Sequence, residues 1–230
     1  MDVEALFLTL RLAASTTLVL LAVAVPLAWW IARGDGVGRG VVQAVVALPL
    51  VLPPTVLGFY LLVTMGPMTG AGRLLIRMMG HPLAFSFAGL LVGSLLYSLP
   101  FAVQPLVAGF RGVDRAYVEA AEGLGVRPRT VFVGVVLPMA RASLLASAVL
   151  TFTHTVGEFG VVLMLGGNIP GATRTLSISL YDMVEEGRYG PANMTAMVLV
   201  GVALAALVLI YAVPPRLRRG WGGDRGDVLG

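Results

Sequence analysis

Three side chains within one apolar run, residues 139–165, have the types that serve in nucleophilic catalysis. They are Ser143, Ser147 and His154. A Ser nucleophile needs a base within hydrogen-bond reach and a third group that orients this base. Side chains on a single helix do not meet in this way, and the sequence has neither the Gly-x-Ser-x-Gly turn nor the His-Glu-x-x-His metal motif. We therefore do not expect an intramembrane protease.

The basic residues exclude two further kinds of chemistry. All 16 of them are Arg, and the sequence contains no Lys. A P-loop uses a Lys to reach the phosphates of a nucleotide, and Schiff-base catalysis uses a Lys amine. The sequence also has no Cys, which removes disulfides and thiolate metal ligands. The chain therefore supplies neither a P-loop ATPase site nor a covalent amine catalyst.

The composition is that of a membrane protein with one domain. Of the 230 residues, 57% are hydrophobic and 12% are charged, against about 25% charged in ordinary soluble domains. The net charge of +4 could suggest nucleic acid as a partner. The Arg residues lie at the ends of apolar runs, however, which is typical of side chains that fix membrane topology. We expect lipid, and not nucleic acid, around this chain.

Five apolar runs are long enough to cross about 30 Å of hydrocarbon as helices. The first could be a signal peptide, but Asp2 and Glu4 stand where such a peptide carries basic residues. We predict an all-α polytopic membrane protein with a five-span core in residues 1–213 and a polar tail in residues 214–230. A sixth or re-entrant segment is the alternative. The five runs are Leu6 to Ile31, Val41 to Val63, Phe85 to Phe110, Met139 to Leu165 and Met194 to Val213.

The distribution of Arg predicts the orientation of these spans. With five spans, the links after the first and third runs lie on the same side as the tail, and this side carries most of the Arg residues. Because basic loops stay in the cytoplasm, the C-terminus is expected there and the N-terminus outside. The cytoplasmic Arg residues would be Arg33, Arg39, Arg111, Arg115, Arg127, Arg129, Arg216, Arg218, Arg219 and Arg225.

The cytoplasmic link, residues 111–138, predicts a short helix that ends at a turn. Good helix formers fill residues 116–124, and Asp114 is placed to cap the N-terminal end. Gly125 can adopt the left-handed conformation that ends a helix, and Pro128 disfavours helical backbone at Arg127. Pro138 fits the first turn of the next span.

This link contains Glu119-Ala120-Ala121, then Gly125, then Val135-Val136-Leu137-Pro138. The pattern resembles the coupling motif of ATP-binding-cassette (ABC) import permeases. The alternative is an ordinary amphipathic cytoplasmic loop. The resemblance implies that the short helix docks into a cleft on a separate ATPase subunit, where ATP and Mg bind. The permease itself would then bind no cofactor and would not be an enzyme.

Further motifs resemble the permease subunits of molybdate importers. They are Leu48 to Gly58, Gly157-Glu158-Phe159-Gly160, Asn168 to Gly171 and Thr173-Arg174-Thr175. Tungstate, sulfate and thiosulfate permeases share related versions, so the anion stays open, and a secondary transporter or channel is a more distant alternative. The resemblance implies a permease homodimer in a prokaryotic inner (plasma) membrane, with two ATPase subunits and an extracytoplasmic oxyanion-binding protein.

Two groups of residues are candidates for the translocation path or its gate. Pro53 and Pro54 remove backbone donors and should bend or open the second span, beside the hydroxyl of Thr55. A kink that only helps the spans to pack is the alternative. Hydrogen-bond donors suited to an oxyanion follow near the outer side, with Arg174 either contacting the anion or reaching the membrane interface. These donors include Thr153, Asn168 and Arg174.

Glu158 is the acidic residue within an apolar run. In a straight helix that begins at Pro138 it would lie about 30 Å along the axis, near the outer end. A carboxylate in hydrocarbon is costly unless it is paired or wetted. We expect a structural or gating role for Glu158, with His154 one turn earlier as a possible partner. Short outer helices are expected within residues 66–82 and 175–186, and close packing at Gly89, Gly93, Gly157 and Gly160.

Overall fold

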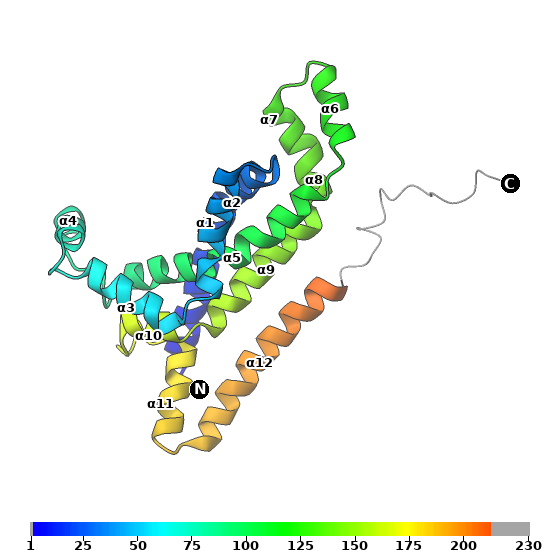
Figure 1. Ribbon diagram of the computed structural model, residues 1–230. Coiled ribbons are helices and arrows are strands. Elements are labelled where there is room, and N and C mark those ends of the chain that lie inside the picture. Colours follow the sequence, from blue (N-terminus) through cyan, green and yellow to red (C-terminus); the bar gives the residue numbers. More distant parts are fainter. Residues whose placement is uncertain (1, 213–230) are drawn as a thin grey trace.

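The computed structural model describes residues 2–212, and all regular secondary structure in this part is helical (Figure 1). The predicted tail, residues 214–230, lies outside the described residues. Three helices are long and apolar enough to cross a membrane. They correspond to the first, third and fifth predicted spans, and they are α1 (Val3–Ala32), α5 (Phe87–Arg111) and α12 (Tyr189–Ala212).

The second predicted span is broken at its prolines, as their chemistry predicts. Helix α2 (Val37–Ala47) continues into the short 3-10 helix η1 (Leu48–Leu50), and the next helix, α3 (Pro54–Met65), is turned by 105°. Pro53 has extended backbone, with φ −55° and ψ 135°. Neither Pro53 nor Pro54 has an N–H to donate, so the helical hydrogen bonds stop there. The pair is either one broken span or a re-entrant loop.

The prediction of a continuous fourth span, Met139 to Leu165, is wrong. Helix α9 (Arg141–Gly157) ends before Glu158, and a separate short helix, α10 (Gly160–Gly166), follows. Glu158 has extended backbone, with φ −66° and ψ 132°. Gly160 packs so closely on α3 that a Cβ there would lie 2.9 Å from Cβ of Pro54. The apolar run thus turns where Gly160, together with Gly58 of α3, allows α10 to approach α3.

A second break precedes α9. The chain enters it through α7 (Pro128–Val131), the π-helix η2 (Phe132–Val136) and α8 (Leu137–Met139). Pro138 lies at the beginning of α8, but Ala140 separates α8 from α9. The segment Pro128–Met139 is bent by 73° relative to α9. With each bent pair counted as one span, the described residues hold five spans, and otherwise three.

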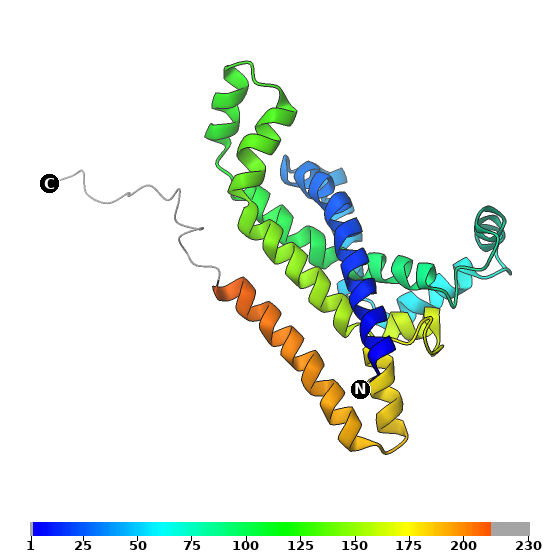
Figure 2. The same cartoon turned by 180° about the vertical axis from the view of Figure 1, so that it is seen from behind.

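Helices α1, α5 and α9 form the packed centre of the fold, and they lie side by side in both views (Figures 1 and 2). Small side chains let them approach. Ala24 and Ala28 of α1 and Ala102 of α5 are fully buried in one apolar cluster. Gly93 confirms the predicted close packing, since a Cβ there would lie 2.9 Å from Cγ1 of Val161 in α10.

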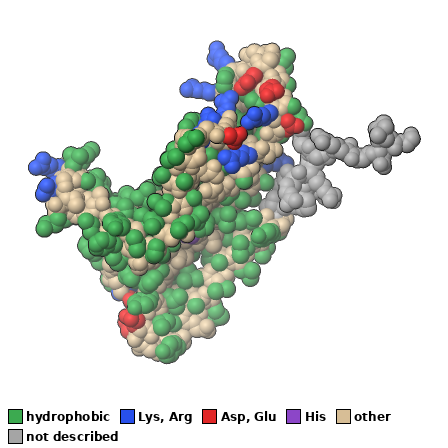
Figure 3. Space-filling view, in the orientation of Figure 1, with side chains coloured by type: hydrophobic (Ala, Val, Ile, Leu, Met, Phe, Trp, Pro, Cys, Tyr) green, Lys and Arg blue, Asp and Glu red, His purple; other side chains and the backbone are tan. Residues whose placement is uncertain are grey.

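The short helices lie around this centre. Helix α4 (Gly70–Met79) projects to one side, and α11 (Leu176–Glu185) lies beside the N-terminal end of α1 (Figure 1). Both were expected. Helix α6 (Arg115–Gly123) lies at the opposite end of the molecule from α11. Charged side chains gather over α6, over α4 and near α11, and hydrophobic side chains cover the surface between them (Figure 3).

Candidate translocation and coupling sites

A cavity of about 480 Å³ lies where α3, α5, α9 and α10 meet. Two of the three breaks in the apolar runs border it, because Pro54 begins α3 and Glu158 follows the end of α9. Four of the predicted path residues, Pro54, Thr55, Thr153 and Glu158, therefore share one site, although they come from two separate parts of the sequence. The lining residues are Pro54, Thr55, Tyr97, Thr153, His154, Gly157, Glu158, Phe159 and Gly160.

The Glu158 carboxyl group is almost fully buried at the edge of this cavity. Its residue is 4% exposed, and neither carboxyl oxygen has a hydrogen-bond partner among residues 2–212. The Ser94 hydroxyl of α5 lies near this group, but the pair does not reach hydrogen-bond geometry, and Ser94 has no other partner within the described chain. Buried polar groups are usually hydrogen-bonded, so this carboxyl stands out.

His154 is not the partner of Glu158, contrary to the possibility drawn from their spacing. Its Nδ1 lies 2.9 Å from Oγ of Ser98, which is in turn 3.0 Å from Oγ1 of Thr155. The imidazole stacks on Phe101 with 3.9 Å between ring centroids and also contacts Tyr97. Residues four apart meet on a continuous helix, and α9 ends between these two. His154 is a packed histidine that joins α9 to α5.

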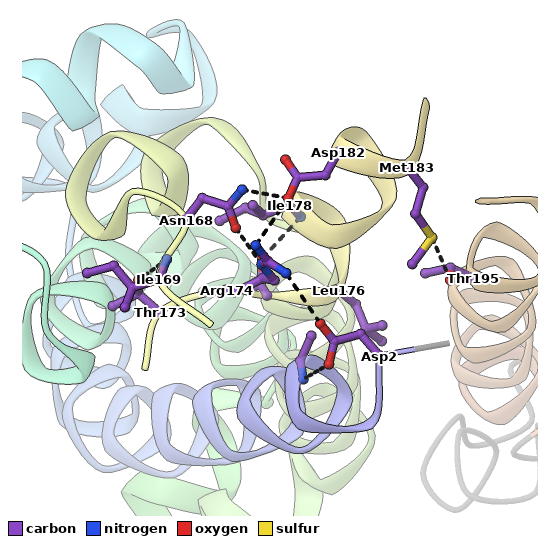
Figure 4. A network of polar contacts seen from close by, with 12 residues as sticks. Asp2, Asn168, Ile169, Thr173, Arg174, Leu176, Ile178, Asp182, Met183 and Thr195 are labelled. Atoms are coloured by element: carbon purple, nitrogen blue, oxygen red, sulfur yellow. Dashed lines mark hydrogen bonds and ion pairs between the residues drawn. The ribbon is translucent and has the colours of Figure 1, made fainter. Parts of the chain in front are cut away.

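Asn168 and Arg174 belong to a second cluster, away from the cavity lining. Nε of Arg174 donates to Oδ1 of Asn168 at 2.6 Å, and its guanidinium lies 3.9 Å from Asp2 and 3.7 Å from Asp182 (Figure 4). Asn168 also donates to Asp182, at 2.5 Å. This Arg174 network ties the first residue before α1 to the loop after α10 and to α11. The predicted path residues are thus divided between two places.

Threonine hydroxyls hold the same loop from the inside, a role the sequence did not reveal. Thr173 donates to the carbonyl of Gly166 at 2.6 Å and accepts from the amide of Ile169 at 3.2 Å. Thr9 of α1 accepts from the amide of Leu176 at 2.9 Å. These bonds satisfy backbone groups that the loop would otherwise bury unpaired. A Thr in an apolar helix gives only a weak sequence signal for such a contact.

The coupling segment has the predicted form. Asp114 caps α6 by accepting from the amide of Ala116 at 3.0 Å, and Gly125 is left-handed with φ +76°. Arg127 then occupies the N-cap position of α7 without a side-chain hydrogen bond, and α7 begins at Pro128. Leu124, at the tip, is 83% exposed, an apolar side chain that the sequence reasoning missed. Its position directly before the helix-ending glycine was the available signal.

Aromatic and charged contacts connect this segment to the membrane helices. Trp29 of α1 packs on Phe110 of α5 and Phe132 of η2, with ring centroids 5.6 Å and 5.3 Å away. Glu119 and Glu122 line a pocket of about 300 Å³, and Trp29 and Phe110 of this cluster line it too. Leu137 is partly buried and packs against the central apolar core, while Pro138 beside it is exposed.

Comparison with known proteins decides the family. The family model described as "Binding-protein-dependent transport system inner membrane component" matches residues 24–219. The chain belongs to this family. Its members are membrane components of transport systems, so this permease is a transport subunit of an inner membrane and not an enzyme. The matched region contains the coupling segment and every candidate path residue.

Individual relatives agree with this assignment. The permease is 49% identical to the molybdenum transport system permease protein ModB of Azotobacter vinelandii, over 92% of this chain and 93% of the relative. It is 31% identical to ModB of Escherichia coli K12, over 91% of each. The strong match to the first extends along nearly the whole of both chains.

Solved structures show the same fold. A chain of a bacterial alginate ABC transporter in complex with an alginate-bound periplasmic protein matches with a TM-score of 0.73 and 18% identity, over 94% of this permease and 79% of that chain. A chain of the inward-facing MetNI methionine ABC transporter matches with a TM-score of 0.69 and 17% identity, over 93% and 96%. The helical arrangement is therefore that of ABC transporters.

Proposed function

We propose that this permease is the membrane subunit of an ATP-driven importer of molybdate. The observation that carries the proposal is the 49% identity, over 92% of the chain, to a molybdenum transport permease. The molybdate-type motifs around Pro53, Glu158 and Arg174 support it, and two of them border the same cavity. Tungstate and sulfate or thiosulfate are the alternative solutes within the same oxyanion class.

Charge and geometry together support a topology for the proposed importer. The coupling segment and the N-terminal end of α1 lie at opposite ends of the molecule (Figures 1 and 2). The Arg-rich links belong to the coupling end, so this end is cytoplasmic and the N-terminus is outside. Two copies of the permease form the pathway, two ATPase subunits bind their coupling segments, and an extracytoplasmic binding protein delivers the anion.

The coupling segment and the cavity are the two ends of one mechanical connection. Helix α9 has 17 residues, which is about 25 Å at about 1.5 Å per residue. It begins directly after the Leu137-Pro138 end of the motif and ends at the cavity with Thr153, Gly157 and Glu158. Closure of the ATPase subunits on ATP moves α6, and η2 and α8 pass this movement to α9. The cavity residues then shift relative to Pro54 and Thr55 of α3.

The cavity suits a passing oxyanion better than a bound one. Its lining offers the hydroxyl donor of Thr55 but contains no Arg, and the Thr153 hydroxyl donates to the carbonyl of Val149 at 2.8 Å. A fixed opposite charge would hold the anion in a path that it has to leave, whereas neutral donors solvate it and let it go. The Arg174 network would then position the outer loop instead of carrying the anion.

Reconstitution tests this function. The permease, its ATPase and its binding protein are assembled in liposomes, and uptake of molybdate, tungstate and sulfate is measured with and without ATP. We expect ATP-dependent uptake that prefers molybdate. Uptake of none of the three oxyanions would overturn the proposal, and uptake without the ATPase would identify a secondary transporter or channel.

A further inference from the structure

The Glu158 carboxyl has the surroundings of a neutral acid and not of a carboxylate. It is buried, both oxygens lack a hydrogen-bond partner among the described residues, and the cavity that it lines has no Arg. An ionised carboxylate in such a place loses its hydration without gaining a positive partner, which costs several kcal/mol. Protonation removes this penalty. The same position is thus tolerable for a carboxylic acid.

The titratable groups that face Glu158 across the cavity do not alter the inference that it is a neutral acid. Helix α5 contributes Tyr97, and α9 contributes His154. Helix α3 contributes Pro54 and Thr55, neither of which titrates, and α10 contributes only Gly160. His154 already shares its Nδ1 with Ser98 and stacks on Phe101. From α11, Tyr181 contacts the neighbouring Phe159 instead of the carboxyl.

Protonation reverses what this group offers to an anion. A carboxylate only accepts hydrogen bonds, whereas a carboxylic acid has one O–H to donate. An acid kept neutral by an apolar site can serve as a donor to negatively charged oxygen. The hydroxyl of Thr55 lines the same cavity, whereas that of Thr153 donates to the carbonyl of Val149 at 2.8 Å. The Glu158 oxygens are covered in this structure, so a shift of α9 relative to α3 is needed to bring the acid and the Thr55 hydroxyl to one anion.

We propose that Glu158 is protonated in the transport cycle and donates its carboxylic O–H, with the hydroxyl of Thr55, to the oxyanion in the cavity. This inference rests on the proposed oxyanion import and assigns it a specificity-determining residue. The ligand class is a tetrahedral oxyanion with acceptor oxygens on several sides. Ionised Glu158 places a negative charge in the anion's path, so passage stops when the proton is lost.

The test compares the wild type with Glu158→Gln at a series of pH values. Gln has the same shape and keeps a donor but cannot ionise. Both are assembled with the same ATPase and binding protein, so that the pH dependence of these partners cancels in the ratio of wild-type to variant uptake. We expect this ratio to be near one at about pH 6 and to fall about tenfold for each pH unit beyond the titration of the acid, because one proton is required.

Two control variants test whether the pH dependence of uptake arises from Glu158. Glu4→Gln removes an exposed carboxyl and should leave the wild-type pH profile unchanged. Glu158→Ala, which loses the donor, should import poorly at every pH and show no alkaline fall of its own. A ratio that is constant with pH, or an assembled Glu158→Gln permease that is inactive at all pH values, would overturn the inference.

A spectroscopic measurement needs no transport. The infrared carbonyl stretch of a protonated carboxylic acid should be present in the wild-type permease at near-neutral pH and absent from Glu158→Gln. Its absence from the wild type would overturn the inference even if molybdate uptake is confirmed. If the wild-type system imports no oxyanion, the proposed function fails, while the infrared result still decides the protonation state.

Discussion

Arg33 at the end of α1 and Glu122 on the coupling helix α6 form an ion pair, with 3.5 Å between Nη2 and Oε1. The guanidinium of Arg33 also lies over the Trp29 ring, at 5.1 Å from its centroid. Glu122 directly follows the Glu-Ala-Ala triplet, outside the fixed positions of the motif. The pair thus ties the segment that would meet the ATPase directly to the first membrane helix.

Removing this ion pair should affect coupling more than stability. Both side chains are nearly half exposed, at 47% and 41%, and pairs of this kind contribute at most about 1 kcal/mol. We expect Glu122→Gln to change the melting temperature little and to lower the molybdate imported per ATP by about twofold. The exchanged pair, Arg33→Glu with Glu122→Arg, should restore the ratio. A loss that the exchange does not repair would show that Glu122 acts through another contact.

The backbone conformation of Gly125 gives a second prediction. Its φ is +76°, and nothing lies within 4 Å of a Cβ built there, so a substitution meets strain and not a clash. Gly125→Val should uncouple ATP hydrolysis from uptake while the permease still inserts, because a β-branched residue resists this conformation, at about 1–2 kcal/mol. Gly125→Asn should retain coupling, since Asn tolerates it.

The matched control for Gly125 lies two residues earlier. Gly123 also has open space around a built Cβ but no left-handed backbone, so Gly123→Val should couple nearly normally. Equal uptake by Gly125→Val and the wild type would contradict a role for this turn in docking.

Thiol labelling can test whether the cavity belongs to the path. The sequence has no Cys, so an introduced one is the single thiol of the chain. Thr153→Cys lines the cavity and should react with a small, water-soluble thiol reagent, and molybdate should slow the reaction. Thr151→Cys, on the same helix but fully buried, should not react. Equal labelling of both positions would contradict a water-filled cavity at Thr153.

The Arg174 network predicts a structural effect instead of a kinetic one. Arg174 and Asp182 share one set of contacts, so Arg174→Ala and Asp182→Asn should each lower the free energy of unfolding by about 1 kcal/mol, and the double variant should lose no more than either. The apparent KM for molybdate should stay unchanged. If Arg174 contacts the anion, Arg174→Ala raises this KM and Asp182→Asn does not.

Features determined by local chemistry could be predicted from the sequence. Pro53 and Pro54 lack amide donors wherever they occur, and the break between η1 and α3 follows from this alone. The cap at Asp114 and the left-handed Gly125 are equally local, and they were confirmed. The roles of these residues in docking and transport stay predictions, because geometry alone does not test them.

Features that depend on distant contacts could not be predicted. The end of α9 at Gly157 lies within a long apolar run, and the chain turns there because Gly160 packs on Pro54, a residue of another helix. The pairing of His154 with Glu158 assumed that α9 continues, so it failed with that assumption. Arg174 finds its acidic partners at Asp2 and on α11, and no spacing in the sequence brings these together.

The π-helix η2, Phe132–Val136, sets the angle at which the coupling helix is presented. A π-turn holds one residue more than an α-turn, and each residue of an α-helix advances about 100° around its axis. If the same five residues became α-helical, α6 and α7 would turn by about that angle relative to α9, and only the loss of one residue, such as Gly134, would restore the present angle in an α-helix. The length of this segment, and not only its composition, therefore decides which face of α6 the ATPase meets.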